Sequence, residues 1–175
     1  METVTSLVVS GHRPPRLGGY FPRAVEVVNK FAVQSLAARR NDTSAPTFDY
    51  VAIGMAQGWD MACARACMIL DIPFVAYLAF EGVERRWPAQ WQRIFQYLCG
   101  HATNVVIVGN GRDPNRDLMA RNTRLLEYAV DVLALCYDES QRSGTADTMR
   151  KARDKGIPVT NLWSRWDLFS KSQGA

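Results

Sequence analysis

Short apolar runs alternate with amphipathic stretches along the 175-residue chain. Most of the runs are rich in Val and Ile and lack strict apolar–polar alternation, a pattern typical of strands buried on both faces of a parallel sheet. The sequence predicts six such strands, at Val4–Val9, Tyr50–Ile53, Phe74–Leu78, Asn104–Val108, Val130–Cys136 and Ile157–Thr160.

Between these runs, apolar residues recur at helical spacing. Five helices are predicted: three on apolar stripes at Val28–Leu36, Trp59–Leu70 and Trp91–Leu98, a fourth from about Asn115 to Tyr128, and a fifth from about Thr145 to Lys155. Strand and helix in repeated alternation imply right-handed crossovers. The predicted class is therefore α/β, with an open, mainly parallel sheet flanked by helices on both faces.

The composition fits one globular domain spanning residues 1–175. Hydrophobic residues make up 47% of the chain and charged residues 22%, both ordinary values for a globular protein. No internal repeat or low-complexity linker divides the chain, and residues 163–175 are predicted to be a C-terminal tail, docked at first and then frayed. The N-terminus carries an acid rather than a basic region, and no apolar run approaches the ~20 residues of a membrane helix. The default expectation is a cytoplasmic protein without a membrane partner.

The four cysteines, at positions 63, 67, 99 and 136, lie inside apolar segments. Cys63 and Cys67 would share one face of a helix, where metal ligation is conceivable. No histidine is nearby in sequence, and a buried free cysteine behaves as a small hydrophobic residue. We therefore expect core packing and predict neither a metal site nor a cofactor.

Unusual residues collect directly after the predicted strands. In an open α/β sheet, ligands bind at the carboxyl ends of the strands. The first strand is followed by Gly11, His12 and Arg13, and the second by a glycine-bearing turn that opens a helix. A second such turn contains Ser143, Gly144 and Thr145. The net charge of +4 tolerates an anionic ligand without requiring nucleic acid.

Glycine-bearing turns that lead into helices are suited to phosphate. The backbone approaches a ligand closely there, and the first helical N–H groups point at it. Neither turn matches a P-loop or the dinucleotide fingerprint, and ordinary turns also use glycine. Two turns beside an arginine-bearing loop favour phosphate more strongly than either turn alone.

The fourth predicted helix places Asn122 in an otherwise apolar stripe, with Arg121 beside it. A buried amide must be hydrogen-bonded, since leaving it unpaired costs on the order of 1–3 kcal/mol. Two interpretations are open. Asn122 ties down a neighbouring loop, or Arg121 and Asn122 reach into the cleft to organise loops or ligand.

Together these segments resemble the SLOG superfamily, which includes YpsA-like proteins, the Lonely Guy phosphoribohydrolases and the DNA-processing protein DprA. The likeness is nearest to the YpsA-like branch. It rests on segments that follow one another in family order over nearly the whole chain: SGHRPPRLGGY, IGMAQGWDMACARAC, FEGVERRWP, the pair Arg121-Asn122, YDES and SGTADTMRKARDKGIPV.

The resemblance implies a modified Rossmann fold that binds nucleotides or nucleotide-derived ligands. It assigns Gly54, Met55 and Gly58 to the first glycine turn, and Ser143, Gly144 and Thr145 to the second, phosphate-holding turn. Gly11, His12 and Arg13 would form the first wall of the cleft. Family relatives form dimers and larger assemblies, so a homo-oligomer is expected, and the apolar residues of the tail are suited to cover a core edge or a subunit contact.

One departure bears on the chemistry. In the Lonely Guy enzymes the glycine turn is followed by Gly-Thr-x-x-Glu, whose glutamate assists glycosidic cleavage. Here Thr148 stands at that position. Asp147 is adjacent, but a helix rotates it by about 100°.

Three functions compete. The first is a binding or sensing module for a nucleotide-like ligand, with Arg13 and Arg121 neutralising phosphate. The second is a hydrolase that cleaves a nucleotide N-glycosidic bond, for which a carboxylate near the anomeric carbon is needed. Glu81 is the first candidate for that carboxylate and Asp138 the second, although pairing of Glu81 with Arg85 or Arg86 is favoured over a catalytic role. The third is single-stranded DNA binding, which calls for aromatic residues on a basic groove.

Overall fold

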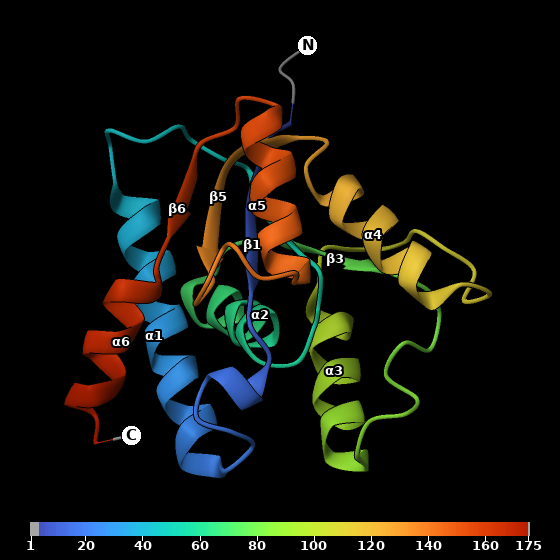
Figure 1. Ribbon diagram of the computed structural model, residues 1–175, viewed down its shortest axis with the longest axis horizontal. Helices are drawn as coiled ribbons and strands as arrows, with labels where there is room; N and C mark the ends of the chain where they lie inside the picture. The colour runs from blue at the N-terminus through green and yellow to red at the C-terminus, as the bar shows by residue number, and fades with distance from the viewer. Residues whose placement is uncertain (1–3, 175) are drawn as a thin grey trace.

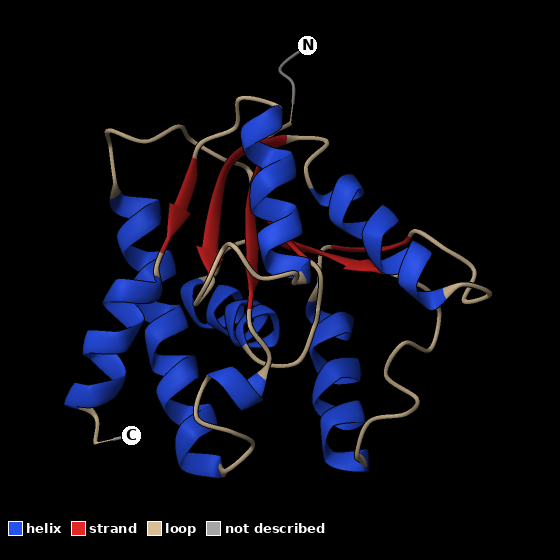
Figure 2. Ribbon diagram, viewed as in Figure 1, coloured by secondary structure: helices blue, strands red, loops and turns tan. Residues whose placement is uncertain are grey.

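The computed structural model describes residues 4–174 of the chain. Its sheet contains β1 (Ser6–Gly11), β2 (Tyr50–Ile53), β3 (Phe74–Leu78), β4 (Asn104–Ile107), β5 (Ala129–Leu135) and β6 (Val159–Asn161). All neighbouring strands are parallel, in the order β4-β3-β2-β1-β5-β6 (Figures 1 and 2). This confirms the predicted fold class. The first strand begins and ends two residues later than predicted, because Ser6 to Gly11 pair with β5 along their whole length.

The helices within residues 4–174 are α1 (Pro22–Asn41), α2 (Trp59–Leu70), α3 (Ala89–His101), α4 (Pro114–Leu125), α5 (Gly144–Asp154) and α6 (Trp163–Ser172), with a short 3₁₀ helix η1 at Pro14–Arg16. One apolar core holds side chains of α1, α2, α3 and α6, and a second holds side chains of α4 and α5. Because the apolar strands contribute to both cores, helices cover both faces of the sheet, as predicted.

The C-terminal segment is a helix, where the sequence predicted only a docked end that frays. Trp166 is buried, and its ring lies 5.4 Å from that of Phe31 in α1. Figure 1 shows α6 alongside α1. This contact explains why the short helix is ordered. Residues 1–3 and 175, which belong to the predicted domain and tail, lie outside the described residues.

Strand order places a crevice at the centre of the sheet. From β1 the chain proceeds through β2 and β3 to the β4 edge, and it then returns across the sheet to β5 on the other side of β1. The loops that leave β1 and β5 therefore diverge towards opposite faces. A ligand site is expected at the carboxyl ends of these two strands.

Candidate functional site

A cleft of about 550 Å³ lies at this point of the sheet. Besides the loops after β1 and β5, it is lined by the start of α2 and by one face of α4. Eight of the eleven predicted ligand-binding residues line it, namely Gly11, His12, Arg13, Arg121, Asn122, Ser143, Gly144 and Thr145.

The remaining three predicted residues, Gly54, Met55 and Gly58, form the turn behind the cleft wall. The carbonyl of Gly54 accepts a hydrogen bond from Nη1 of Arg121. Met55 is buried with a φ of 57°, a left-handed conformation that is uncommon for a residue with a side chain. Gly58 has a φ of 95°, and a Cβ there would lie 2.6 Å from the carbonyl oxygen of His12. These residues shape the cleft from behind.

This β2–α2 turn also concentrates unsatisfied polar atoms. Within the described part of the chain, five buried side-chain atoms lack a hydrogen-bond partner, and three belong to Gln57, Trp59 and Asp60. Such groups are rare in folded proteins and often mark functional positions or bound water. These atoms cluster beside Met55, whose backbone is left-handed. The turn is therefore the part of the site with the most unsatisfied hydrogen-bonding groups.

Asp60 is the one carboxylate among the residues that line the cleft. It is 5% exposed, and its Oδ2 accepts a hydrogen bond from the backbone of Ala56 at 3.3 Å. Burial raises the pKa of Asp60 to about 6, against the opposing attraction of Arg121. Asp60 was not among the predicted ligand-binding residues. Its place two residues after Gly58, at the mouth of the turn, was the signal that could have marked it as a cleft residue.

Arg121 and Asn122 join the two glycine turns across the cleft. Nε of Arg121 donates to Oδ1 of Asn122 at 3.1 Å, and Nδ2 of Asn122 donates to the carbonyl of Gly144 at 3.4 Å. Burial lowers the pKa of Arg121, partly offset by Asp60. The pair thus ties down two loops, as the first interpretation states. It also lines the cleft, as the second requires.

The N-terminus of α5 opens onto the cleft. Oγ of Ser143 caps the helix by accepting from the backbone N–H of Ala146 at 3.0 Å. For the N–H groups of Gly144 and Thr145, no acceptor is found within residues 4–174. Free N–H groups at a helix start bind anions.

The positions next to this turn carry no free carboxylate. The hydroxyl of Thr148 donates to the carbonyl of Gly144 at 3.0 Å. Asp147 pairs with Arg150 at 2.7 Å and Lys151 at 2.9 Å. The arrangement therefore differs from the Gly-Thr-x-x-Glu pattern in chemistry as well as in sequence.

The first wall of the cleft is held by His12. Its Nε2 accepts a hydrogen bond from the backbone N–H of Tyr137 at 2.8 Å, and its ring meets the edge of Trp163 at 5.8 Å. Burial, reinforced by Arg16, lowers the pKa of His12. A neutral imidazole is needed for this acceptor role. By contrast, the side chain of Arg13 is exposed and makes no ion pair or hydrogen bond to the described residues.

The two candidate catalytic carboxylates lie outside the cleft lining. Oδ1 of Asp138 accepts hydrogen bonds from the N–H and the hydroxyl of Ser140, at 2.9 and 2.7 Å, and these bonds lower the pKa of Asp138. Glu81 is exposed in the loop after β3.

Comparison with known proteins gives matches of structure alone. No family model matches the chain, and no curated protein resembles it in sequence. The DNA processing protein A (DprA) of Streptococcus pneumoniae aligns with a TM-score of 0.58 and 22% identity over 89% of this chain and 49% of its own. TM1055, a structural genomics target, aligns with a TM-score of 0.55 and 18% identity, over 89% and 72% respectively.

A third structure is DNA processing protein A from Helicobacter pylori, described for its mode of binding single-stranded DNA. It gives a TM-score of 0.60 and 15% identity over 98% of this chain and 74% of its own. The chain spans about half the length of the S. pneumoniae protein. At these identities the matches establish the fold. The chain has the Rossmann-like fold of DNA processing protein A, as the resemblance to the SLOG superfamily predicts.

Proposed function

We propose that the cleft binds a nucleotide or a nucleotide-derived phosphate ligand, and that the protein acts as a sensing or regulatory module. The observation that carries this proposal is the uncapped pair of N–H groups at Gly144 and Thr145, which open onto the cleft together with Arg13. Helix N–H groups and a nearby guanidinium are a common way to bind phosphate.

Charge and size support the same ligand class. Arg13, Arg16 and Arg121 line the cleft against the single acid Asp60. The volume of about 550 Å³ lies within the range of small-molecule and cofactor sites, roughly 300–1,000 Å³. A mononucleotide or a nucleotide sugar is of this size and carries the negative charge that the arginines would neutralise.

Sensing is favoured over hydrolysis by the state of the carboxylates. Glycosidic hydrolysis needs a carboxyl group at the reacting carbon. Asp60 lines the cleft but accepts a hydrogen bond from the backbone of Ala56, and Asp138 is bonded within its own loop. An N-glycosidase with Glu81 or Asp138 as its carboxylate remains the alternative, to be tested by base release.

Single-stranded DNA is the second candidate, because the H. pylori protein with this fold is described as binding it. The basic lining of the cleft suits a phosphate backbone. However, no Phe, Tyr or Trp is among the cleft-lining residues, and stacking aromatics are a main source of affinity for single strands. This ranks DNA below a small nucleotide. The homo-oligomer expected from the resemblance also stays a prediction.

The direct test is calorimetric titration and thermal shift with AMP, ADP, ADP-ribose, NAD and cyclic dinucleotides. A ligand at a hundred times its dissociation constant stabilises the fold by ~2.7 kcal/mol. We expect Arg13→Ala to weaken binding roughly tenfold, about 1.4 kcal/mol, without lowering stability. Arg86→Ala removes an equally exposed arginine outside the cleft and serves as the matched control.

Two further measurements separate the alternatives. Release of free base from the bound nucleotide, seen by chromatography, would favour the hydrolase. Tighter binding of oligo(dT) than of any nucleotide, with affinity that falls steeply with salt, would favour DNA. If neither nucleotides nor oligo(dT) bind to the folded protein, the proposed function is wrong.

A further inference from the structure

The sequence of α2 is apolar on every side. Of its twelve residues, only Asp60 and Arg65 are charged. A helix that is apolar all round is normally buried all round. The face of α2 towards the sheet is buried, through Trp59 and Cys63 among others. Its opposite face is buried only in part: Met61 there is 3% exposed, whereas Ile69 is 55% exposed.

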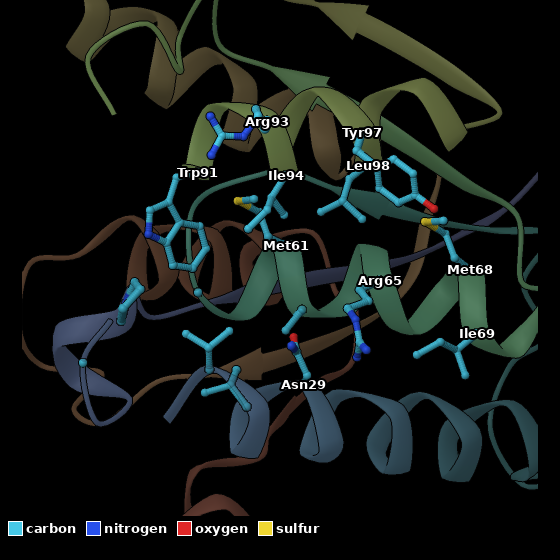
Figure 3. A pocket seen from close by; sticks show the side chains of 16 residues that line it. Asn29, Met61, Arg65, Met68, Ile69, Trp91, Arg93, Ile94, Tyr97 and Leu98 are labelled. Atoms are coloured by element: carbon cyan, nitrogen blue, oxygen red, sulfur yellow. The ribbon is translucent and has the colours of Figure 1, made fainter. Parts of the chain in front are cut away.

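This outer face of α2 is the floor of a groove of about 550 Å³ between α1 and α3. Figure 3 shows Met61, Arg65, Met68 and Ile69 on the floor, with α1 on one side and α3 on the other. The walls carry mainly apolar side chains, among them Val25, Val28, Trp91, Ile94, Tyr97 and Leu98.

The charges of the groove have one sign. Arg65 and Arg93 line it, and neither makes an ion pair or a hydrogen bond through its side chain to the described residues. No acidic residue is among those that line this groove. Glu26, which lines the adjoining surface, pairs with Lys30 at 3.0 Å. The groove therefore combines an apolar body with two unpaired cations.

Size and charge restrict the occupant. The floor runs from Gly58 to Ile69, about 16 Å at 1.5 Å per residue. A second copy of the chain would bring two more unpaired arginines against Arg65 and Arg93. A narrow, linear, anionic molecule fits both constraints.

We propose that this groove is a binding site for a single-chain amphiphilic carboxylate, such as a medium- or long-chain fatty acid. The tail lies along Met61, Met68 and Ile69, and the carboxylate lies at Arg65, with Arg93 adding to the attraction. Methionine side chains adapt to a flexible chain of variable shape. The site does not depend on the nucleotide cleft, although the two share a wall: Pro14 and Gly58 face the groove, whereas Arg13 and Asp60 face the cleft.

The test uses the full chain and dodecanoate below its micelle-forming concentration, titrated by calorimetry. We expect saturable binding with one site per chain. Butyrate has the same head group without the tail, and dodecyltrimethylammonium has the same tail with the opposite charge. Neither should bind measurably at the concentrations that saturate the site with dodecanoate.

Two variants locate the site. Arg65→Glu should weaken dodecanoate binding by about five- to tenfold, since it replaces attraction by repulsion at an exposed position. Arg86→Glu makes the same charge change outside the groove and should leave binding unchanged. Ile69→Asp, on the exposed floor, should weaken binding at least as much as Arg65→Glu.

Several outcomes would overturn the proposal. These are no binding of dodecanoate up to about 1 mM, equal binding of the cationic amphiphile, or equal effects of Arg65→Glu and Arg86→Glu. A dimer in sedimentation equilibrium that Ile69→Asp dissociates would assign the groove to a second copy instead. Binding to anionic vesicles without binding of monomeric dodecanoate would assign it to a membrane surface.

Discussion

The cleft and the groove have equal volumes and opposite construction. The cleft is made of loop backbone and charged side chains at the carboxyl ends of strands. It contains the unsatisfied Asp60, and the turn behind its wall contains the left-handed Met55. The groove is made of regular helix surfaces and apolar side chains. Strain and unsatisfied polarity mark the first as a specific polar site. Only an exposed apolar floor marks the second.

The largest effect on the free energy of unfolding is expected at the wall that the two cavities share. Gly58→Ala should destabilise the fold by about 3–5 kcal/mol, because the backbone there has a φ of 95° and the new Cβ would meet the carbonyl of His12. Urea unfolding measures the change. Gly156→Ala, also at positive φ but with no atom within 4 Å of the new Cβ, isolates the cost of the conformation. Equal losses in both variants would show that the wall is not tightly packed.

A pH series tests whether the cleft contains a destabilising buried acid. The folded-state pKa of Asp60, about 6, lies above its ordinary value of 3.8. The folded protein therefore holds this proton more tightly, and the contribution of Asp60 to the free energy of unfolding falls as pH rises from about 4 to 6. The fall is roughly 3 kcal/mol for a difference of about two pH units. Asp60→Asn should remove this slope.

Asp138 supplies the contrasting case for the same series. Its pKa is lowered by the hydrogen bonds of Ser140, so its contribution is present above the ordinary pKa and is lost as pH falls. Asp138→Asn should therefore change the slope in the opposite sense to Asp60→Asn. Urea midpoints at several pH values distinguish the two, and slopes of the same sign would contradict the assigned burial of Asp60.

A smaller effect is expected at the first wall of the cleft. His12→Ala removes the acceptor of the Tyr137 N–H and the ring contact with Trp163, and should cost about 1–2 kcal/mol. Because the pKa of His12 is lowered in the folded state, this contribution is lost as pH falls below 6.5. His101→Ala, at an exposed histidine, is the control. A cost that does not depend on pH would mean that Nε2 is not the acceptor.

The smallest effect is predicted for the groove. Ile69→Asp should change the free energy of unfolding by less than about 0.5 kcal/mol, because the side chain is already exposed and belongs to no polar network. Thermal unfolding without ligand measures this. A large loss would mean that the floor of the groove is part of the core and is not a free surface.

The sequence predicted more of the cleft than of the groove, for a physical reason. Parallel strands bring their carboxyl ends to one edge, so residues as distant as Gly11 and Thr145 could be grouped because each follows a predicted strand. The hydrogen bond from Arg121 to the carbonyl of Gly54 could not be predicted, because it depends on how far one side chain of α4 extends towards the β2–α2 turn. Glu81 follows a strand as well, but it is exposed and is not among the residues that line the cleft.

The groove could not be predicted because it depends on the spacing between helices. Cys63 and Cys67 pack into the core as expected, and nothing in their pattern indicates how far α3 stands from α1. The C-terminal end of α2 is a second example of what the sequence does not predict. Nothing in the sequence indicates whether its apolar residues Met68 and Ile69 are covered, and the structure leaves them partly or largely exposed. Tertiary spacing, rather than helix propensity, decides whether such a face is covered.

The loop from Gly11 to Arg16 borders both cavities, since Pro14 lines the groove and Arg13 and Pro15 line the cleft. This loop packs so closely against Trp59 and Gly58 that neither Gly11 nor Gly58 has room for a methyl group. A ligand that displaces this loop from one side changes the surface that the other ligand meets. Thermodynamic linkage then requires the two affinities to change by the same factor, whichever ligand binds first. In such a protein, the level of one metabolite would set the sensitivity to another.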